Sequence, residues 1–308
     1  MSLAPYAVLV RISRLVGPWF FAGVARCIAT GYFIFSPKVR ESRRLYAIVF
    51  PKRSRWFHLW CAFCQYQSFT TIHFDRFLTN DGQLPIFTCE GVEALNERIN
   101  HGGALLLMSH LGNWEMAARL MMHQGYETPL LLYMGVKEKE GVERRQKEEL
   151  QQAGVTIIGV DQGAATPFTA VEGLKILRQG GLVSMAGDII WRQHQRRIPV
   201  QVLGHPAFVS EAPFAFALVS GAPIIVFFAF RTGRNCYRLT FSEPIWVISE
   251  RREDRHQAIA QAAQRYADLL EAALGAHPRE WYHFDRFLLD PGDAPDSPDS
   301  PGRGFFPG

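Results

Sequence analysis

Short runs of apolar residues alternate with amphipathic stretches through the middle of the chain. Because strands that alternate with helices at this spacing form parallel sheets, the pattern predicts an α/β fold with a mainly parallel central sheet flanked by helices. The predicted buried strands are residues 104–108, 129–134, 155–159, 182–186 and 224–230, with an edge strand at 237–241. The predicted helices are residues 114–123, 137–152, 170–179, 211–219 and 254–274.

One long apolar run has to be divided before it can be assigned. Residues 212–230 carry no charge, and hydropathy alone would predict a transmembrane helix there. The run is interrupted by Ser220-Gly221-Ala222-Pro223, which breaks a helix. We therefore predict a buried helix, a turn and a buried strand.

The N-terminal segment has a different pattern. Residues 15–25 and 27–37 are uncharged, but Arg26 separates them, whereas a spanning helix needs about 20 apolar residues. A removable signal peptide is poorly supported, because no small-residue cleavage site follows a clean apolar run. The aromatic side chains and flanking arginines favour a helix that lies in the membrane interface. A buried helix pair is the alternative.

Charge strengthens the membrane interpretation in the segment that follows. Between Pro37 and Trp56 lie the bases Lys38, Arg40, Arg43, Arg44, Lys52, Arg53 and Arg55, against the single acid Glu41. Such a cluster beside an apolar segment is attracted to anionic lipid at about 1 kcal/mol per base. We expect a membrane surface as one partner of the protein.

These patterns suggest four parts. Residues 1–36 would form the membrane-associated N-terminal helix region, and residues 37–90 a helical subdomain rich in basic and aromatic residues. Residues 91–290 would form the α/β core. The tail at 291–308, rich in Pro, Asp, Ser and Gly, is predicted to be disordered.

Composition narrows the class of protein. Apolar residues make up 48% of the 308 residues and charged residues 20%, which allows a large core and excludes a disordered or fibrous chain. Five cysteines without framework spacing argue against a disulfide-rich secreted scaffold. The net charge of +4 indicates no partner by itself. We find no motif for a metal, a cofactor or a nucleic acid.

The candidate chemistry lies where the first buried strand ends. His110 follows that strand, and a helix begins near Asn113, with Glu115 in its first turn. In open α/β sheets, ligands bind beyond the carboxyl ends of the strands. If the turn folds His110 back beside Glu115, the carboxylate can accept a ring N–H and leave the other ring nitrogen as a general base for an alcohol. The helix N-terminus would offer backbone N–H groups to an oxyanion.

The same residues carry a resemblance to a known family. The segment His110-Leu-Gly-Asn-Trp-Glu115 after an apolar strand resembles the His-x4-Asp/Glu signature of glycerolipid-type acyltransferases. In this form it is similar to the bacterial lipid A biosynthesis acyltransferases, the late lauroyl and myristoyl transferases. Other similar segments are Ser36–Glu41, Ala47–Pro51, Asp75-Arg76, Pro199–Ala207, Ala217–Pro223 and Pro278–Phe287.

The resemblance implies an activity and its location. A fatty acyl group would pass from a thioester of acyl carrier protein or coenzyme A to the hydroxyl of a lipid, a lipid A precursor above all. His110 would be the base and Glu115 its orienting partner, without a cofactor. The family implies the cytoplasmic face of the bacterial inner membrane.

Further residues are candidates for binding the substrate. Asn113 lies beside the proposed base, and Asp188 and Arg192 follow the strand at 182–186. Arg231 ends the strand at 224–230. Because arginine binds phosphate with a rigid fork of donors, Arg192 suits a phosphorylated headgroup, and Arg231 suits either a headgroup or a contact with acyl carrier protein.

Other functions stay open at this point. The acceptor could be another membrane lipid, such as a glycolipid, an ornithine-type lipid or a polyene lipid. A hydrolase would pass the acyl group to water. A non-catalytic membrane protein would bind lipid alone. The sequence does not determine the acyl length or the oligomeric state.

Overall fold

The structure is a computed structural model that describes residues 3–80, 82–123, 128–134, 141–152, 154–159, 167–190 and 195–290. The predicted tail at 291–308, the start of the predicted helix at 137–152 and Arg192 lie outside these residues.

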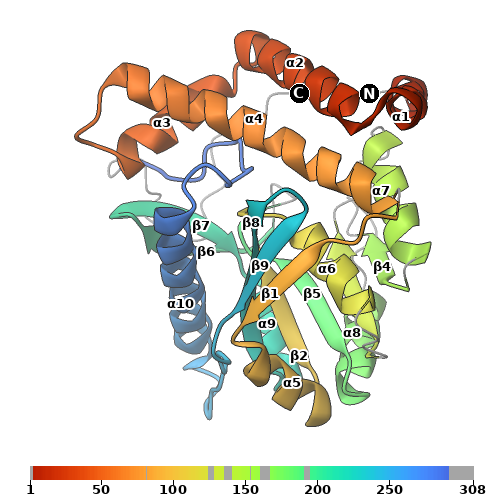
Figure 1. The fold of residues 1–308 in the computed structure, drawn as a ribbon. Coiled ribbons are helices and arrows are strands. Elements are labelled where there is room, and N and C mark those ends of the chain that lie inside the picture. The colour runs from red at the N-terminus through yellow and green to blue at the C-terminus, as the bar shows by residue number, and fades with distance from the viewer. Residues whose placement is uncertain are drawn as a thin grey trace.

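A central sheet organises the described chain (Figure 1). Its seven strands follow the order β1-β9-β8-β2-β5-β3-β4, and a separate hairpin is formed by β6 and β7. Every neighbouring pair in the sheet is parallel except β8 and β9. The predicted α/β fold with a mainly parallel sheet is therefore confirmed. The strands are β1 (Ile86–Glu90), β2 (Ala104–Met108), β3 (Leu130–Met134), β4 (Thr156–Gly159), β5 (Leu182–Ala186), β6 (Arg197–Val202), β7 (His205–Ser210), β8 (Ile224–Gly233) and β9 (Cys236–Phe241).

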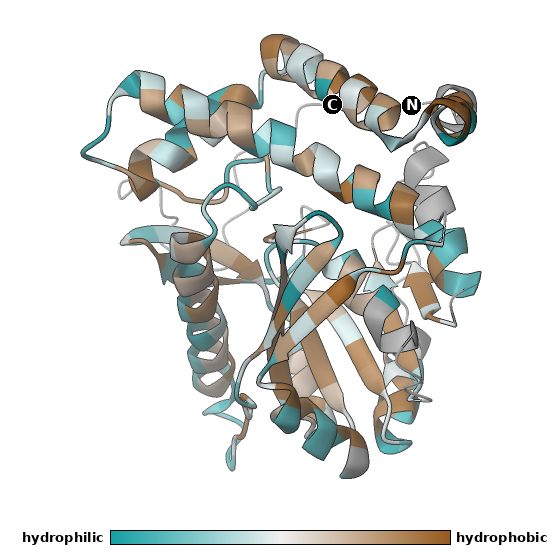
Figure 2. Cartoon of the chain, in the orientation of Figure 1, coloured by the Kyte–Doolittle hydropathy of each residue, from teal (hydrophilic) through white to brown (hydrophobic). Residues whose placement is uncertain are grey.

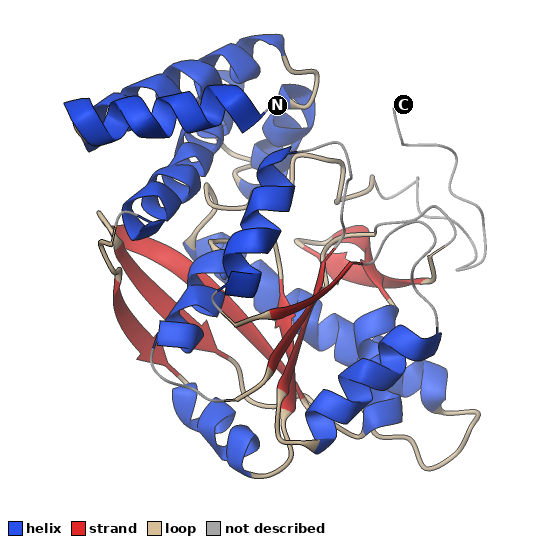
Figure 3. Ribbon diagram, turned by 90° about the vertical axis from the view of Figure 1, so that its right-hand side faces the viewer, coloured by secondary structure: helices blue, strands red, loops and turns tan. Residues whose placement is uncertain are grey.

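Helices cover both faces of this sheet and one end of it, as the rotated view in Figure 3 shows. The helices within the sheet-forming part are α5 (Val92–Asn100), α6 (Trp114–His123), α7 (Gly141–Gln152), α8 (Pro167–Arg178), α9 (Ala212–Ser220) and α10 (Arg255–Ala276). The N-terminal helices are α1 (Leu3–Val16), α2 (Pro18–Phe35), α3 (Val39–Val49) and α4 (Arg55–Asn80).

The alternation of side chains along the strands gives the sheet two cores. Leu105 and Leu107 of β2 point to one face, where Phe214 of α9 and Tyr266 of α10 are buried. Leu106 points to the other face, where α5, α6 and α7 supply the apolar residues Leu95, Met116, Ala117 and Leu150. Because β2 is buried on both faces, it is apolar at every position, and a run of this kind is recognisable in the sequence.

Two strand assignments differ from the sequence prediction. Residues 86–90 fall in the predicted helical subdomain, but they form β1, which pairs in parallel with β9. The predicted edge strand, β9, therefore lies second from the edge. Strand β1 was not predicted because it is a half-exposed strand of five residues without an apolar run.

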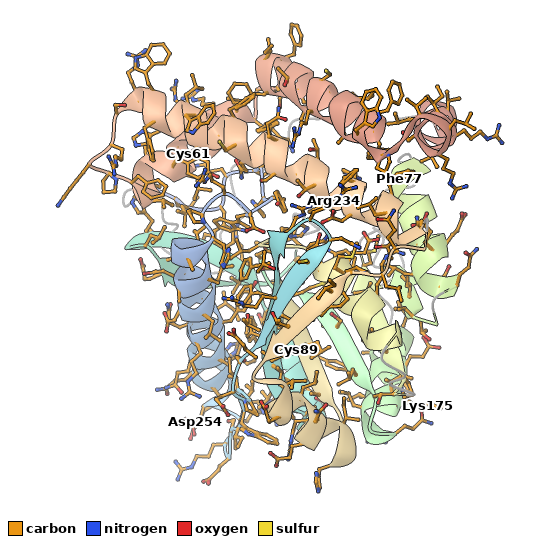
Figure 4. The ribbon with its side chains drawn as sticks, in the orientation of Figure 1. Cys61, Phe77, Cys89, Lys175, Arg234 and Asp254 are labelled. Carbon is orange, nitrogen blue, oxygen red and sulfur yellow. The ribbon has the colours of Figure 1, made fainter. Side chains whose placement is uncertain are left out.

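The four N-terminal helices form a layer across one end of the sheet (Figure 1). Gly17 separates α1 from α2, which begins at Pro18. Helix α2 packs on α4, where Phe21 stacks on Phe77 at a ring distance of 4.9 Å, and Figure 4 labels Phe77 on the side of α4 that faces α1 and α2. Hydropathy colouring shows how apolar α2 is (Figure 2). Of the helices in the described ranges, α2 alone has the length and composition to cross a membrane, and only 11% of it is buried.

Candidate active site

Strand register places His110 next to Asp188. Strands β2 and β5 pair in parallel with Met108 opposite Ala186, so the residues two positions further on meet beyond the carboxyl ends of both strands. The two side chains are 78 residues apart in sequence. This is the edge of a parallel sheet at which ligands bind.

The Asp188 carboxylate holds His110 by one contact to the ring and one to the backbone. Its Oδ1 lies 2.9 Å from the His110 Nδ1, and its Oδ2 accepts the His110 backbone N–H at 2.8 Å. Trp281 donates its indole N–H to the same carboxylate at 3.1 Å. Because Asp188 is buried and accepts all three bonds, the ring is fixed with Nδ1 protonated and Nε2 available to a substrate.

Each member of the pair shifts the pKa of the other: the pKa of Asp188 is lowered and that of His110 is raised. Burial alone would raise the pKa of Asp188, but the charge and hydrogen bonds of His110 bring that pKa well below its ordinary value. Burial acts to lower the pKa of His110, but the Asp188 carboxylate outweighs it and raises that pKa above its ordinary value. The result is a carboxylate that stays ionised and an imidazole with increased basicity.

The imidazole is reachable from outside. Its side chain is 29% exposed, whereas that of Asp188 is fully buried. A C-terminal segment lies beside it: Tyr282 donates its backbone N–H to the His110 carbonyl at 2.8 Å, and the His283 ring lies 6.1 Å from the His110 ring at a steep angle. Burial lowers the pKa of His283, so this neighbour favours the neutral form.

Glu115 occupies a different environment from the one expected. Its buried carboxylate accepts two bonds from Arg76 Nε at 3.0 Å each and a further one from Arg76 Nη2. Arg119 Nε and Nη2 donate to Oε1 at 3.0 and 2.9 Å. Arg119 also reaches Glu149, so Glu115 joins α6 to α4 and, through Arg119, to α7. Burial acts to raise the pKa of Glu115, but the two guanidinium groups lower it.

The contact expected between Glu115 and the His110 ring is therefore replaced by the contact with Asp188. The turn between β2 and α6 explains the difference. Gly112 adopts a φ of +81°, a conformation that favours glycine, and a Cβ there would collide with the carbonyl oxygen of Ala229. The chain reverses between the two residues, so His110 faces β5 while Glu115, in the first turn of α6, faces α4.

Two other candidate residues belong to a second buried network. Arg231 Nε donates to the Asp75 carboxylate at 2.6 Å, and Tyr237 donates its hydroxyl to the same carboxylate at 2.5 Å. Asn113 donates to the Tyr237 hydroxyl at 3.2 Å. The structure thus places Asn113 and Arg231 in a link between α4 and the sheet, and it does not bring them to the His110 ring.

Three backbone N–H groups near His110 already donate hydrogen bonds within the protein. Gly112 donates to Glu280 and Asn113 to Ala229, and Leu111 donates to the Ser109 hydroxyl. These three amides are not available to an oxyanion. Within the described ranges, no group of three or more His, Cys, Asp or Glu side chains is placed to hold a metal ion.

Sequence reasoning gives Asp188 a substrate-binding role and misses its contact with His110. It also assigns no role at the site to Trp281 and His283, although both lie in the segment Pro278–Phe287 that carries part of the family resemblance. Arg76 stands out only through the same resemblance. Local sequence offers no signal for these contacts because each joins residues from distant parts of the chain.

A mainly parallel sheet that carries an imidazole–carboxylate pair beyond its strand ends is an α/β arrangement that can support general-base chemistry. The family model for the bacterial lipid A biosynthesis acyltransferases matches residues 74–289, which contain the whole of this site. The chain belongs to that family. No curated protein matches the chain in sequence. Lipid A acyltransferases are membrane-associated, and the exposed apolar helix α2 suits such a location.

Proposed function

We propose that the protein transfers a fatty acyl chain from a thioester to a hydroxyl of a lipid A precursor, with His110 as the general base and Asp188 as its orienting partner. The donor would be acyl carrier protein or coenzyme A, and the site of action the cytoplasmic face of the inner membrane. The observation that carries the proposal is the 2.9 Å contact between His110 Nδ1 and Asp188, inside the region that matches the family.

The chemistry needs no covalent enzyme intermediate. His110 Nε2 takes the proton of the acceptor hydroxyl as its oxygen attacks the thioester carbonyl carbon. The tetrahedral intermediate then collapses and breaks the carbon–sulfur bond. The imidazolium returns the proton to the departing thiolate, so the products are an ester and a free thiol. Asp188 stabilises the imidazolium between these two proton transfers.

In this proposal Glu115 is a positioning residue. It holds Arg76 and Arg119, and so fixes the start of α6 against α4 and α7. The turn that carries His110 immediately precedes α6. A correct placement of this helix therefore determines where the imidazole lies relative to the bound acyl chain.

The test is to replace His110 with Ala in the full-length protein. Loss of a positioned general base should lower the transfer rate by about 10²–10⁴-fold, while folding and vesicle binding are kept. The matched control is His101→Ala, since His101 is an exposed histidine of the same domain. An unchanged transfer rate in the His110 variant would rule out the mechanism.

The same assay decides between the alternatives. Acyl carrier protein and coenzyme A thioesters are supplied side by side, and the lipid products are identified by mass spectrometry. An acylated lipid A precursor among the products supports the proposal. An acylated lipid of another class would identify that lipid as the acceptor instead. Release of free fatty acid alone indicates a hydrolase, and no turnover indicates a lipid-binding protein.

A further inference from the structure

Four arginines gather around one hollow in the N-terminal helical layer. The hollow has a volume of about 540 Å³, and its lining consists of Arg40, Arg43, Arg44, Ala47, Arg55 and His58. We call it the arginine pocket. It lies apart from the His110–Asp188 pair, and neither the base nor its partner lines it.

The short connection between α3 and α4 builds this pocket. Residues 40, 43, 44 and 47 are spaced so that they share one face of α3. The chain reverses over residues 50–54, and α4 then brings Arg55 and His58 of its first turn to the same hollow. His58 Nε2 donates to the Phe50 carbonyl at 2.9 Å, which ties α4 to that connection.

Most of the positive charge in the pocket has no counter-charge. Arg44 contacts Asp290 at 2.6 Å and the Leu288 carbonyl, but in the described part of the chain Arg40, Arg43 and Arg55 form no ion pair. Like charges three or four residues apart on a helix repel one another. A bound anion removes that repulsion, and the planar fork of arginine is suited to the oxygens of phosphate.

The surroundings of the pocket indicate where that anion comes from. Trp56 and Trp60 of α4 are 68% and 57% exposed, and they share the helix face next to Arg55. Exposed tryptophans of this kind are typical of the membrane–water interface. The exposed apolar helix α2 packs on α4 in the same layer (Figure 2). The pocket is also concave, which suits a small headgroup better than the convex face of a protein.

We propose that the arginine pocket binds the phosphate group of a membrane lipid. The proposal does not depend on acyl transfer, since none of the groups used for catalysis contributes to the pocket. It differs from the general attraction of basic residues to anionic membranes because it requires specific guanidinium groups around one hollow. Arg44 also borders a second hollow lined by Trp281 and His283, so the pocket adjoins the segment beside His110.

The experiment is vesicle flotation with the full-length protein. Phosphatidylcholine vesicles contain either phosphatidic acid or an amount of oleate that gives the same negative charge. The pocket variant is R40Q/R43Q/R55Q, and the matched control is R11Q/K52Q/R53Q, which loses three exposed bases of the same N-terminal region outside the pocket. The variant R40K/R43K/R55K keeps the charge and removes the guanidinium forks.

Both variants lose three positive charges, and with them the same part of the general attraction to anionic vesicles. The pocket variant should bind phosphatidic acid vesicles about tenfold more weakly than the control variant does, whereas the two variants should bind oleate vesicles alike. The lysine variant should lose part of the preference for phosphatidic acid over oleate. His110→Ala should bind as the unchanged protein does, so a failure of the catalytic proposal would leave this result intact.

Three outcomes would overturn the proposal. An equal loss in the pocket and control variants would show diffuse electrostatic attraction. Displacement from the vesicles by inorganic phosphate at concentrations comparable to those of the lipid would show a site for the free anion. Unchanged vesicle binding together with lost binding of purified acyl carrier protein would show a docking site for a protein.

Discussion

At the scale of single residues, the central feature is an imidazole whose basicity is set by one buried carboxylate. The Asp188 carboxylate accepts hydrogen bonds from the His110 ring, the His110 backbone and the Trp281 indole. These three donors favour its ionised form and fix its position. The rate and the pH dependence of the reaction should both respond to this carboxylate.

Asp188→Asn should lower the maximal transfer rate by about 10²-fold or more, since the imidazolium loses its stabilising charge. The sign of the pH effect follows from the raised pKa of His110. Without the carboxylate, the effect of burial prevails and the pKa of His110 falls. The imidazole then stays neutral to lower pH, so the acidic limb of the kcat profile shifts to lower pH. Asp268→Asn, in an exposed acid of α10, is the control and should leave the profile unchanged.

Glu115→Gln should act mainly on stability. The change leaves two buried guanidinium groups without their shared carboxylate, and breaking a buried ion pair costs about 3–5 kcal/mol. Folding lowers the pKa of Glu115, so its stabilising effect is present above the unfolded-state pKa and is lost as pH falls through the folded value. Urea unfolding measures the cost.

The same variant separates two roles for Glu115. As a positioning residue, it should leave the acidic limb of the kcat profile where it is. A shift of that limb without loss of stability would show that Glu115 acts on the imidazole directly.

At the scale of elements, the turn from β2 into α6 sets the direction of both residues of the motif. Gly112 makes this turn possible by adopting a positive φ against the backbone of Ala229. The Gly112 amide is bonded to Glu280, and the Asn113 amide to Ala229, so the turn is held from two sides.

Gly112→Ala should therefore destabilise the protein and reduce transfer. The positive φ alone costs about 1–3 kcal/mol, and the collision with Ala229 adds to it. Gly204→Ala is a matched control, because Gly204 also has a positive φ but faces open space. Equal unfolding free energies and equal activities of the two variants would contradict this account of the turn.

At the scale of the whole molecule, buried polar contacts fasten the helical layer to the sheet. Asp75 of α4 accepts bonds from Arg231 and Tyr237, and Glu115 binds Arg76 of the same helix. Arg234, in the turn between β8 and β9, lies over the Phe74 ring of α4, and Figure 4 labels it beneath that helix. The layer that we propose to contact the membrane is thus coupled to the strand ends that hold the site.

A double-mutant cycle measures this coupling. Asp75→Asn, Arg231→Gln and the double variant are unfolded in urea, and the interaction energy between the two positions should be about 1–3 kcal/mol, because direct partners in a network are not additive. Additive losses would mean that the Asp75–Arg231 contact does not link the layer to the sheet.

The sequence by itself determined the fold class and the place of His110. The strands at 104–108 and 182–186 are apolar at nearly every position because both of their faces are buried, and this pattern depends on local residues alone. Strand β1 has no such pattern, because it is short and half-exposed. The family signature likewise lies in one continuous segment, so the order of residues along the chain is enough to recognise it.

Tertiary structure alone decided which carboxylate meets the imidazole. His110 and Asp188 meet because β2 and β5 pair in a particular register, and no local pattern encodes the pairing of strands so far apart in sequence. Glu115 is near His110 along the chain, but the turn at Gly112 directs the two side chains to different neighbours. The arginine pocket arises in the same way, because a helix face and the first turn of the next helix become one surface only after the chain reverses between them.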